Sequence, residues 1–100
     1  MVLSLKQKII LRNLKEAMSQ CKVDYLNAYV AFYQFYLKMI EKYDDVDNME
    51  YIDRERLLHL GNESVNQRMK LQKAIRAYYN FKAIVKDEYI DSVSSNYEVH

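Results

Sequence analysis

The chain contains no proline and no tryptophan, and it has one glycine and one cysteine among its 100 residues. Folds built from β-strands need many turns, and turns depend on glycine and proline, so this shortage argues against an all-β fold. A single cysteine, Cys21, excludes an intramolecular disulfide and is typical of a protein in a reducing compartment. Since no apolar run at the N-terminus resembles a secretory signal, we expect a cytoplasmic protein.

Patterns for catalysis and for metal binding are also missing. One cysteine and two histidines, at positions 21, 59 and 100, do not have the spacing of a zinc site. The acidic stretch 44–55 has neither the glycine at the sixth position nor the ligand order of a calcium-binding EF-hand loop. No glycine-rich loop precedes a helix, and no Ser-His-Asp order suggests a triad. We therefore expect a protein with no catalytic site, no metal and no cofactor.

One short pattern resembles a known catalytic motif. Arg54, followed by four residues and His59, resembles the active-site motif of the helical HEPN ribonucleases. In that family such a pair, usually in a dimer, would stabilise and protonate the cleaved phosphate. The resemblance covers six residues, and Glu55 departs from the neutral polar residue commonly found at its position. The other interpretation is a surface arginine and a histidine near a helix C-terminus, and we expect a protein that is not an enzyme.

The strongest positive feature is an unbroken alternation of three- and four-residue gaps between apolar positions. This spacing indicates one helix face turned toward a partner. Ser4 and Gln7 form a capping box, so we expect a helix that begins at Leu5 and continues to the acidic stretch 44–48. A break near Val23, with Asp24 as a new N-cap, is the less favoured alternative. The face consists of Leu11, Leu14, Met18, Cys21, Tyr25, Ala28, Phe32, Phe35 and Met39.

A second apolar stripe joins the first between positions 25 and 40. Its presence predicts that this half of the helix is enclosed on most sides. The segment is shorter than the ~20 apolar residues of a membrane span and carries polar groups that hydrocarbon would not tolerate, so no membrane helix is expected. The stripe consists of Leu26, Val30, Tyr33, Leu37 and Ile40.

The rest of the chain predicts two further helices. Asp47 and Glu50 form a cap pair for a helix from Asn48 to Leu60, and Gly61 is placed to end it as the C′ residue. Ser64 and Gln67 form a capping box for a third helix from Val65 to about Ile90. Its predicted face is Leu71, Ala74, Tyr78, Phe81 and Val85.

The predicted fold is therefore all-α, a long helical hairpin or bundle of three helices whose second arm is kinked at Gly61. Residues 1–91 would form a single helical domain, and residues 92–100 a frayed polar tail. A first helix of ~58 Å does not fit inside a compact chain of this length, whose radius of gyration would be ~13 Å. Because a two-layer hairpin leaves one side of each helix bare, we expect a homodimer that completes a bundle. The alternative is a broken first helix in a compact monomer.

The leading functional prediction is a small interaction module, a regulator or accessory protein that acts through contacts with itself and with another protein. Ten tyrosines against three phenylalanines favour half-buried seams and interfaces, because tyrosine combines a large apolar ring with a hydroxyl that stays in water. The composition is typical of an AT-rich genome, such as that of a bacterium, phage or other virus. The predicted interface residues are Tyr25, Tyr29, Phe32, Tyr36 and Tyr78, of which Tyr29 and Tyr36 lie closest to the rim.

The alternative is a nucleic-acid-binding regulator. Between Ser64 and Lys86 there are six basic residues and no acidic one, and the glycine before this segment gives the spacing of a helix-turn-helix corner. A basic helix would contact phosphates and base edges. The candidate contacts on the helix 65–86 are Gln67, Lys70, Lys73 and Arg76.

Overall fold

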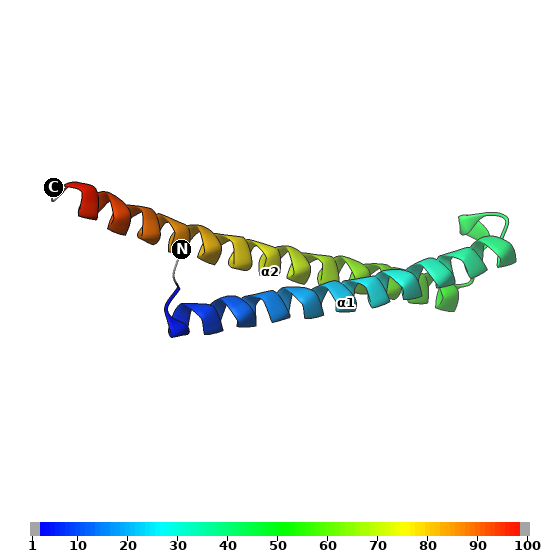
Figure 1. Ribbon diagram of the computed structural model, residues 1–100. Helices are drawn as coiled ribbons and strands as arrows, with labels where there is room; N and C mark the ends of the chain where they lie inside the picture. The colour runs from blue at the N-terminus through cyan, green and yellow to red at the C-terminus, as the bar shows by residue number, and fades with distance from the viewer. Residues whose placement is uncertain (1–2, 99–100) are drawn as a thin grey trace.

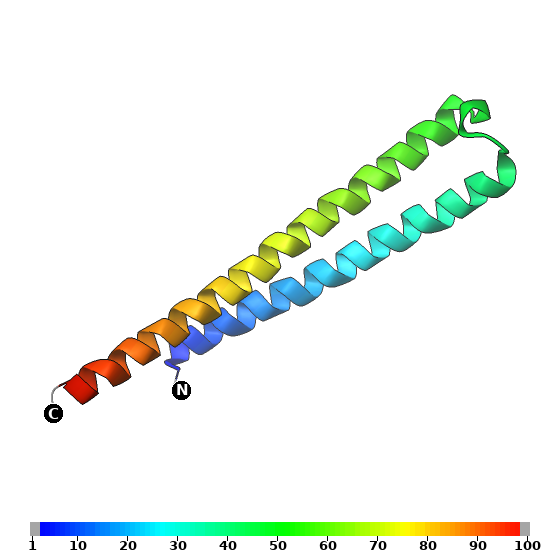
Figure 2. The same ribbon diagram turned by 90° about the horizontal axis from the view of Figure 1, so that it is seen from above.

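The computed structural model describes the backbone of residues 3–98 and the side chains of residues 3–86. Two long helices, α1 (Leu5–Lys42) and α2 (Tyr51–Glu98), are joined by a turn that contains the short 3-10 helix η1 (Val46–Asn48). Figures 1 and 2 show the helices side by side and antiparallel, with the end of α2 extending past the start of α1. The radius of gyration is 22.3 Å, against ~13 Å for a compact chain of this length. The predicted all-helical, elongated hairpin is confirmed.

α1 is continuous through Val23, as the unbroken spacing predicted. Its start is fixed by the predicted capping box: the Gln7 amide donates to Ser4 Oγ at 3.1 Å, and the Ser4 amide donates to Gln7 Oε1 at 3.0 Å. It ends at Lys42, where the Tyr43 amide still donates to the Met39 carbonyl while the Tyr43 backbone turns to an extended conformation.

The predicted division of the second arm into two helices, with a kink at Gly61, is wrong. Gly61 lies inside the continuous helix α2, and its φ is not positive, so it does not act as a C′ residue. Its role is to admit Phe32: a Cβ built on Gly61 would lie 3.3 Å from Phe32 Cε2. The predicted cap Ser64 is instead buried, at 8% exposure.

The predicted ends of the second arm also differ from the structure. α2 begins at Tyr51, so Asp47 is not its N-cap. Asp47 belongs to η1, where its amide donates to Asp45 Oδ1 at 3.2 Å. The hydrogen bond at the start of α2 is donated by the Arg54 amide to the Glu50 carbonyl. The helix then runs to Glu98, past the predicted end near Ile90. Fraying of residues 92–100 stays a prediction, since their side chains lie outside the described part.

The two helices meet along one narrow apolar seam. In α1 every residue of the predicted face is buried or half-buried, and α2 shows the same alternation of three and four residues. Among side chains 3–86, only Met39, Met49, Ser64 and Val85 are less than a tenth exposed. The core of the hairpin is therefore thin. Its members on α2 are Leu57, Leu60, Ser64, Gln67, Leu71, Ala74, Tyr78, Phe81 and Val85.

The thin core leaves a large surface in water. The accessible surface is 8128 Å², whereas a compact monomer of 12.1 kDa exposes roughly 6000 Å². The second stripe, Leu26 to Ile40, is not enclosed within the chain as predicted, because each of its members is 42–53% exposed. The second stripe was predicted to be enclosed, and in the hairpin it is exposed to water.

The closed end of the hairpin is held by one carboxylate. Asp53 Oδ2 accepts from Lys42 Nζ at 2.8 Å and from the Tyr43 hydroxyl at 2.7 Å, so the last turn of α1 is tied to the first turn of α2. Hydrogen bonds from Lys42 and then Tyr43 lower the pKa of Asp53, and the hydrogen bond to Asp53 raises the pKa of Lys42. Both shifts favour the charged pair.

These shifts predict how stability depends on pH. Because the pKa of Asp53 is lowered in the folded chain, its contribution is present above the unfolded pKa of about 4 and is lost as the pH falls through the folded value. The raised pKa of Lys42 acts in the other direction: its contribution is lost only as the pH rises through the folded value, above about 10. We expect Asp53→Asn to lower the urea midpoint at pH 7 and to remove part of the loss seen at pH 3. An unchanged pH profile would contradict this assignment.

The position of Gly61 gives a second prediction. In a helix interior alanine is favoured over glycine by about 1 kcal/mol, and the added methyl group requires Phe32 to shift by a few tenths of an ångström. Phe32 is half-buried beside an open groove and has room to move. We expect Gly61→Ala to stabilise the hairpin by about 0.5 kcal/mol in urea denaturation. A lower midpoint would mean that the ring cannot shift.

Candidate functional site

The sides of the hairpin are distinguished by heptad positions. We letter each seven-residue repeat a to g, with a at Tyr25 and Phe32 in α1 and at Leu57 and Ser64 in α2. Positions a, e and b follow one another around a helix, at 0°, about 40° and about 100°. Positions d, g and c follow in the other direction. Each helix therefore has an e/b side and a g/c side flanking the seam.

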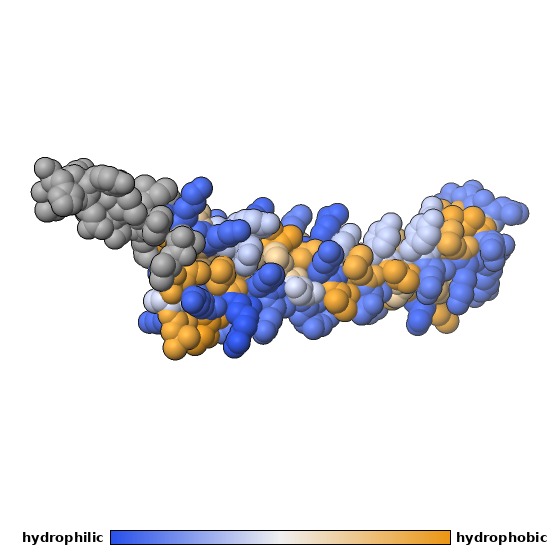
Figure 3. Space-filling model, in the orientation of Figure 1, coloured by the Kyte–Doolittle hydropathy of each residue, from blue (hydrophilic) through white to orange (hydrophobic). Residues whose placement is uncertain are grey.

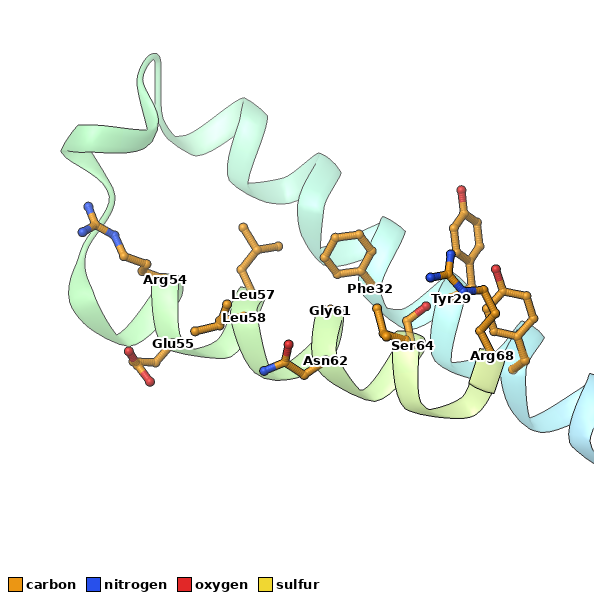
Figure 4. A pocket seen from close by; sticks show the side chains of 12 residues that line it. Tyr29, Phe32, Arg54, Glu55, Leu57, Leu58, Gly61, Asn62, Ser64 and Arg68 are labelled. Carbon is orange, nitrogen blue, oxygen red and sulfur yellow. The ribbon is translucent and has the colours of Figure 1, made fainter. Parts of the chain in front are cut away.

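A groove shows that the e/b sides of both helices lie on the same side of the hairpin. It has a volume of about 590 Å³, and its apolar walls are Tyr29 and Phe32 from α1 and Leu58 and Val65 from α2. Figure 4 shows the Phe32 ring of α1 beside Gly61 of α2, which supplies the floor because it has no side chain. The other lining residues are Tyr25, Arg54, Glu55, Leu57, Asn62, Ser64 and Arg68.

A second groove continues on this side toward the turn. It has a volume of about 290 Å³ and shares Leu57 with the first. Tyr36 and Ile40 line it from α1, and Val46 and Met49 line it from the turn. The e/b side is thus hollowed over much of the half of the molecule nearest the turn.

We call the apolar surface around these grooves the tyrosine face. Its side chains are 42–58% exposed, which is high for large apolar residues. Tyr29 stacks on Tyr33, with ring centroids 6.2 Å apart and planes inclined by 8°. Figure 3 shows hydrophobic patches between hydrophilic ones along the visible side of the hairpin. The tyrosine face consists of Leu26, Tyr29, Tyr33, Tyr36 and Ile40 of α1 and Leu58 and Val65 of α2.

The g/c side of the hairpin has the opposite character. Its c positions are all exposed and, apart from Ile52, all polar, with amides at most of them. One broad side of the molecule is therefore suited to water, and the other exposes aromatic and aliphatic groups. The residues at the c positions are Lys6, Asn13, Gln20, Asn27, Gln34, Glu41, Ile52, His59, Asn66, Lys73 and Asn80.

Beyond the tyrosine face, toward the open end, the e/b side becomes basic. Its charged residues are all exposed and all positive, and only Arg12 has an ion pair among the described residues, with Glu16 at 3.9 Å. Like charges on neighbouring helices repel, so this surface favours an anionic partner. We call it the basic stripe; it consists of Lys8, Arg12, Lys15, Lys22, Arg68, Lys82 and Lys86.

The predicted interface residues fall into two groups. Tyr29 and Tyr36 are 45% and 42% exposed and lie on the tyrosine face, at the rim positions expected for them. Tyr25, Phe32 and Tyr78 are half-buried in the seam, although Tyr25 and Phe32 also line the larger groove. Sequence reasoning missed Leu58 and Val65, which a repeat of seven on α2 would have placed beside the tyrosines.

Of the four predicted nucleic-acid residues, Gln67 lies apart from the other three. Gln67 is half-buried in the seam and donates to Glu63 Oε1 at 2.8 Å. Lys70 and Lys73 border a shallow hollow on the g/c side, and Arg76 lies one turn further along α2. The predicted helix-turn-helix corner is wrong, because α2 is continuous at Gly61 and no second helix crosses it.

The Arg54–His59 pair does not converge within one chain. Residues five apart on a helix point about 140° away from each other. Arg54 lines the larger groove and donates to the Val46 carbonyl at 3.3 Å, whereas His59 is exposed at a c position. Arg54 therefore contributes to the turn and the groove of its own chain.

Searches for other kinds of site and for relatives add no assignment. Among the described residues, no three Cys, His, Asp or Glu side chains are grouped to hold a metal ion, and no helix combines the length and apolarity needed to cross a membrane. No protein-family model matches this chain, and no curated protein or solved structure is significantly similar to it.

Proposed function

We propose that this chain is a non-enzymatic helical interaction module, a regulator or accessory protein whose tyrosine face binds other helices. The observation that supports the proposal is a second heptad stripe on α1, which shares Leu26, Tyr33 and Ile40 with the tyrosine face and continues it around the helix with Val23, Val30 and Leu37. It has the same spacing as the seam, lies on the far side of the helix from it, and is 42–53% exposed along its whole length. A sustained heptad pattern is the mark of a helix–helix contact.

The energetics favour burial of this surface. Apolar area removed from water contributes about 25 cal/mol per Å², so covering the exposed half of each large side chain contributes on the order of 1 kcal/mol. Tyrosines are suited to this role because their rings give contact area at a low cost in conformational entropy while the hydroxyl reaches the rim. The adjoining tyrosines on α1 supply several such anchors in one row.

Site-specific photo-crosslinking tests the proposal. A photoreactive phenylalanine analogue at Tyr33 is expected to form adducts with protein, either with a second copy or with another chain, in both purified protein and extract of the source cells. The same analogue at Asn27, on the g/c side of the same helix, is the matched control and should give few adducts. Equal yields from the two positions, or none from either, would rule out a docking role for the tyrosine face.

A further inference from the structure

We infer that the occupant of the tyrosine face is a second copy of this chain, packed antiparallel, so that the acidic turn of each copy lies over the basic stripe of the other. This inference rests on the proposed function and names the partner and its orientation. It is carried by charge complementarity along the e/b side and by the size of the exposed face.

The turn is as acidic as the stripe is basic. Residues 43–50 include Asp44, Asp45, Asp47 and Glu50 and no basic residue. None of the four carboxylates forms an ion pair within the described chain, because the two ion pairs there are Arg12–Glu16 and Lys42–Asp53. The acidic turn therefore has no ion pair within the described chain, and in the basic stripe only Arg12 has one, so the two regions are complementary in charge.

The spacing of the two regions fits a two-fold axis near Phe32, at the middle of the tyrosine face. At 1.5 Å per residue, Lys22 lies about 15 Å from Phe32 toward the open end, and Lys15 lies about 26 Å away. The acidic turn lies about 15–20 Å away in the other direction. A two-fold axis across the hairpin exchanges these two directions. α1 then packs on the partner's α1, and the acidic turn of each copy lies opposite the Lys15–Lys22 segment of the other.

A parallel arrangement would have the opposite effect. With the turns at the same end, the four carboxylates of each turn would adjoin those of the partner, and the two basic stripes would adjoin each other. Like-charge contacts of this kind disfavour an orientation even where the apolar faces still match. A closed, two-fold dimer also uses one self-complementary patch, which Tyr29 and Tyr36 provide by flanking the Phe32 position almost evenly.

The size of the face is adequate for a stable contact. The stripe from Val23 to Ile40 is about 26 Å long, and the molecule is 21 Å across in its second dimension. A footprint of these dimensions covers about 550 Å², and the contacts between each acidic turn and the partner's basic stripe would bring it toward the ~800 Å² that each partner buries in a standard interface. Two hairpins joined in this way form a four-helix bundle, in which the bare sides of the helices become the core.

Spin-label distances test the orientation in the full-length chain. In a Cys21→Ala background, a label at Asn48→Cys in the turn should give an inter-copy distance of about 40 Å, and one at Asn13→Cys about 57 Å, because both positions lie far from the axis. A parallel dimer would give less than about 25 Å at both positions, since the molecule is only 21 Å across. Short distances at both positions would overturn the antiparallel arrangement.

Charge reversal tests the contacts between the turn and the stripe. Lys15→Glu with Lys22→Glu should raise the dimer dissociation constant about tenfold at low salt, and adding Asp44→Lys with Asp47→Lys should restore it. Lys70→Glu with Lys73→Glu, on the g/c side, is the matched control and should change it less than about twofold. Failure of the second pair to restore affinity would overturn the proposed contacts.

The two proposals fail in different ways. A monomer at all concentrations in sedimentation, together with Tyr33-specific adducts to another protein, would overturn the second copy as partner and leave the interaction module in place. An absence of adducts from Tyr33 would contradict both the interaction module and the antiparallel dimer. Circular dichroism on every variant separates lost association from lost folding.

Discussion

Replacing Tyr29 and Tyr36 by glutamate is expected to weaken self-association by more than about a thousandfold, or about 4 kcal/mol. The two rings are 45% and 42% exposed in the hairpin, so they are available to a partner and not required by the seam. Loss of a tyrosine anchor commonly costs about 2 kcal/mol or more, and each new carboxylate would lose water on binding. Sedimentation velocity over a range of concentrations measures the change.

Asn27→Glu with Gln34→Glu is the matched control for this experiment. These residues lie on the same helix, have the same seven-residue separation and receive the same charge, but they occupy c positions on the polar side. Their replacement is expected to leave the dissociation constant within about threefold of the wild-type value, the range typical of surface charges. If both pairs weaken association equally, net charge and not the tyrosine face governs it.

Met39→Ala is expected to destabilise the hairpin by about 3 kcal/mol, the middle of the range for truncating a buried methionine. Met39 is 7% exposed and is the one α1 residue of the described part that the hairpin buries almost completely. It lies at the closed end, where the two helices first meet. Since the chain has few other buried side chains, the loss is a large fraction of its stability. Urea denaturation at a concentration where the chain is monomeric measures it.

Leu37→Ala is the comparison for the core variant. Leu37 is a side chain of similar size two residues earlier on α1, but it is 42% exposed because it points away from the seam. At low concentration its truncation should cost less than about 1 kcal/mol. A loss equal to that of Met39→Ala in the monomer would mean that the exposed stripe is packed within a single chain, contrary to the structure.

Much of the fold was predictable because it depends on local signals. Ser4 and Gln7 fix the start of α1 through hydrogen bonds within one turn, and the three-four spacing that begins at Leu11 indicates a helix wherever no proline interrupts it. The elongated hairpin followed from the length of that helix alone. These features need no knowledge of what the helix packs against.

The second arm was harder to predict because two of its signals are ambiguous. A glycine ends a helix when its φ is positive, but it also permits close approach, and only the position of Phe32 shows that Gly61 does the latter. Ser64 and Gln67 stand three residues apart, which is the spacing of a capping box and equally that of two neighbouring seam positions. The choice depends on the other helix, which the local sequence does not contain.

The tyrosine face was predictable only in part. The stripe on α1 was visible as a second set of apolar positions, but whether it is enclosed or exposed depends on how many helices surround it. Leu58 and Val65 were hidden in a segment assigned to two separate helices, so their seven-residue relation to each other was not used. The basic stripe likewise emerges only when residues of α1 and α2, far apart in the chain, are brought to one side.

The contact between Phe32 and Gly61 also determines the alignment of the two helices. Gly61 is the one place on α2 where an aromatic ring can rest directly against the backbone, since the chain has no other glycine. Sliding the helices by one heptad, about 10 Å, would set this ring against the arginine at position 54 or at position 68. The contact with Gly61 therefore favours this alignment of the two helices over one shifted by a heptad.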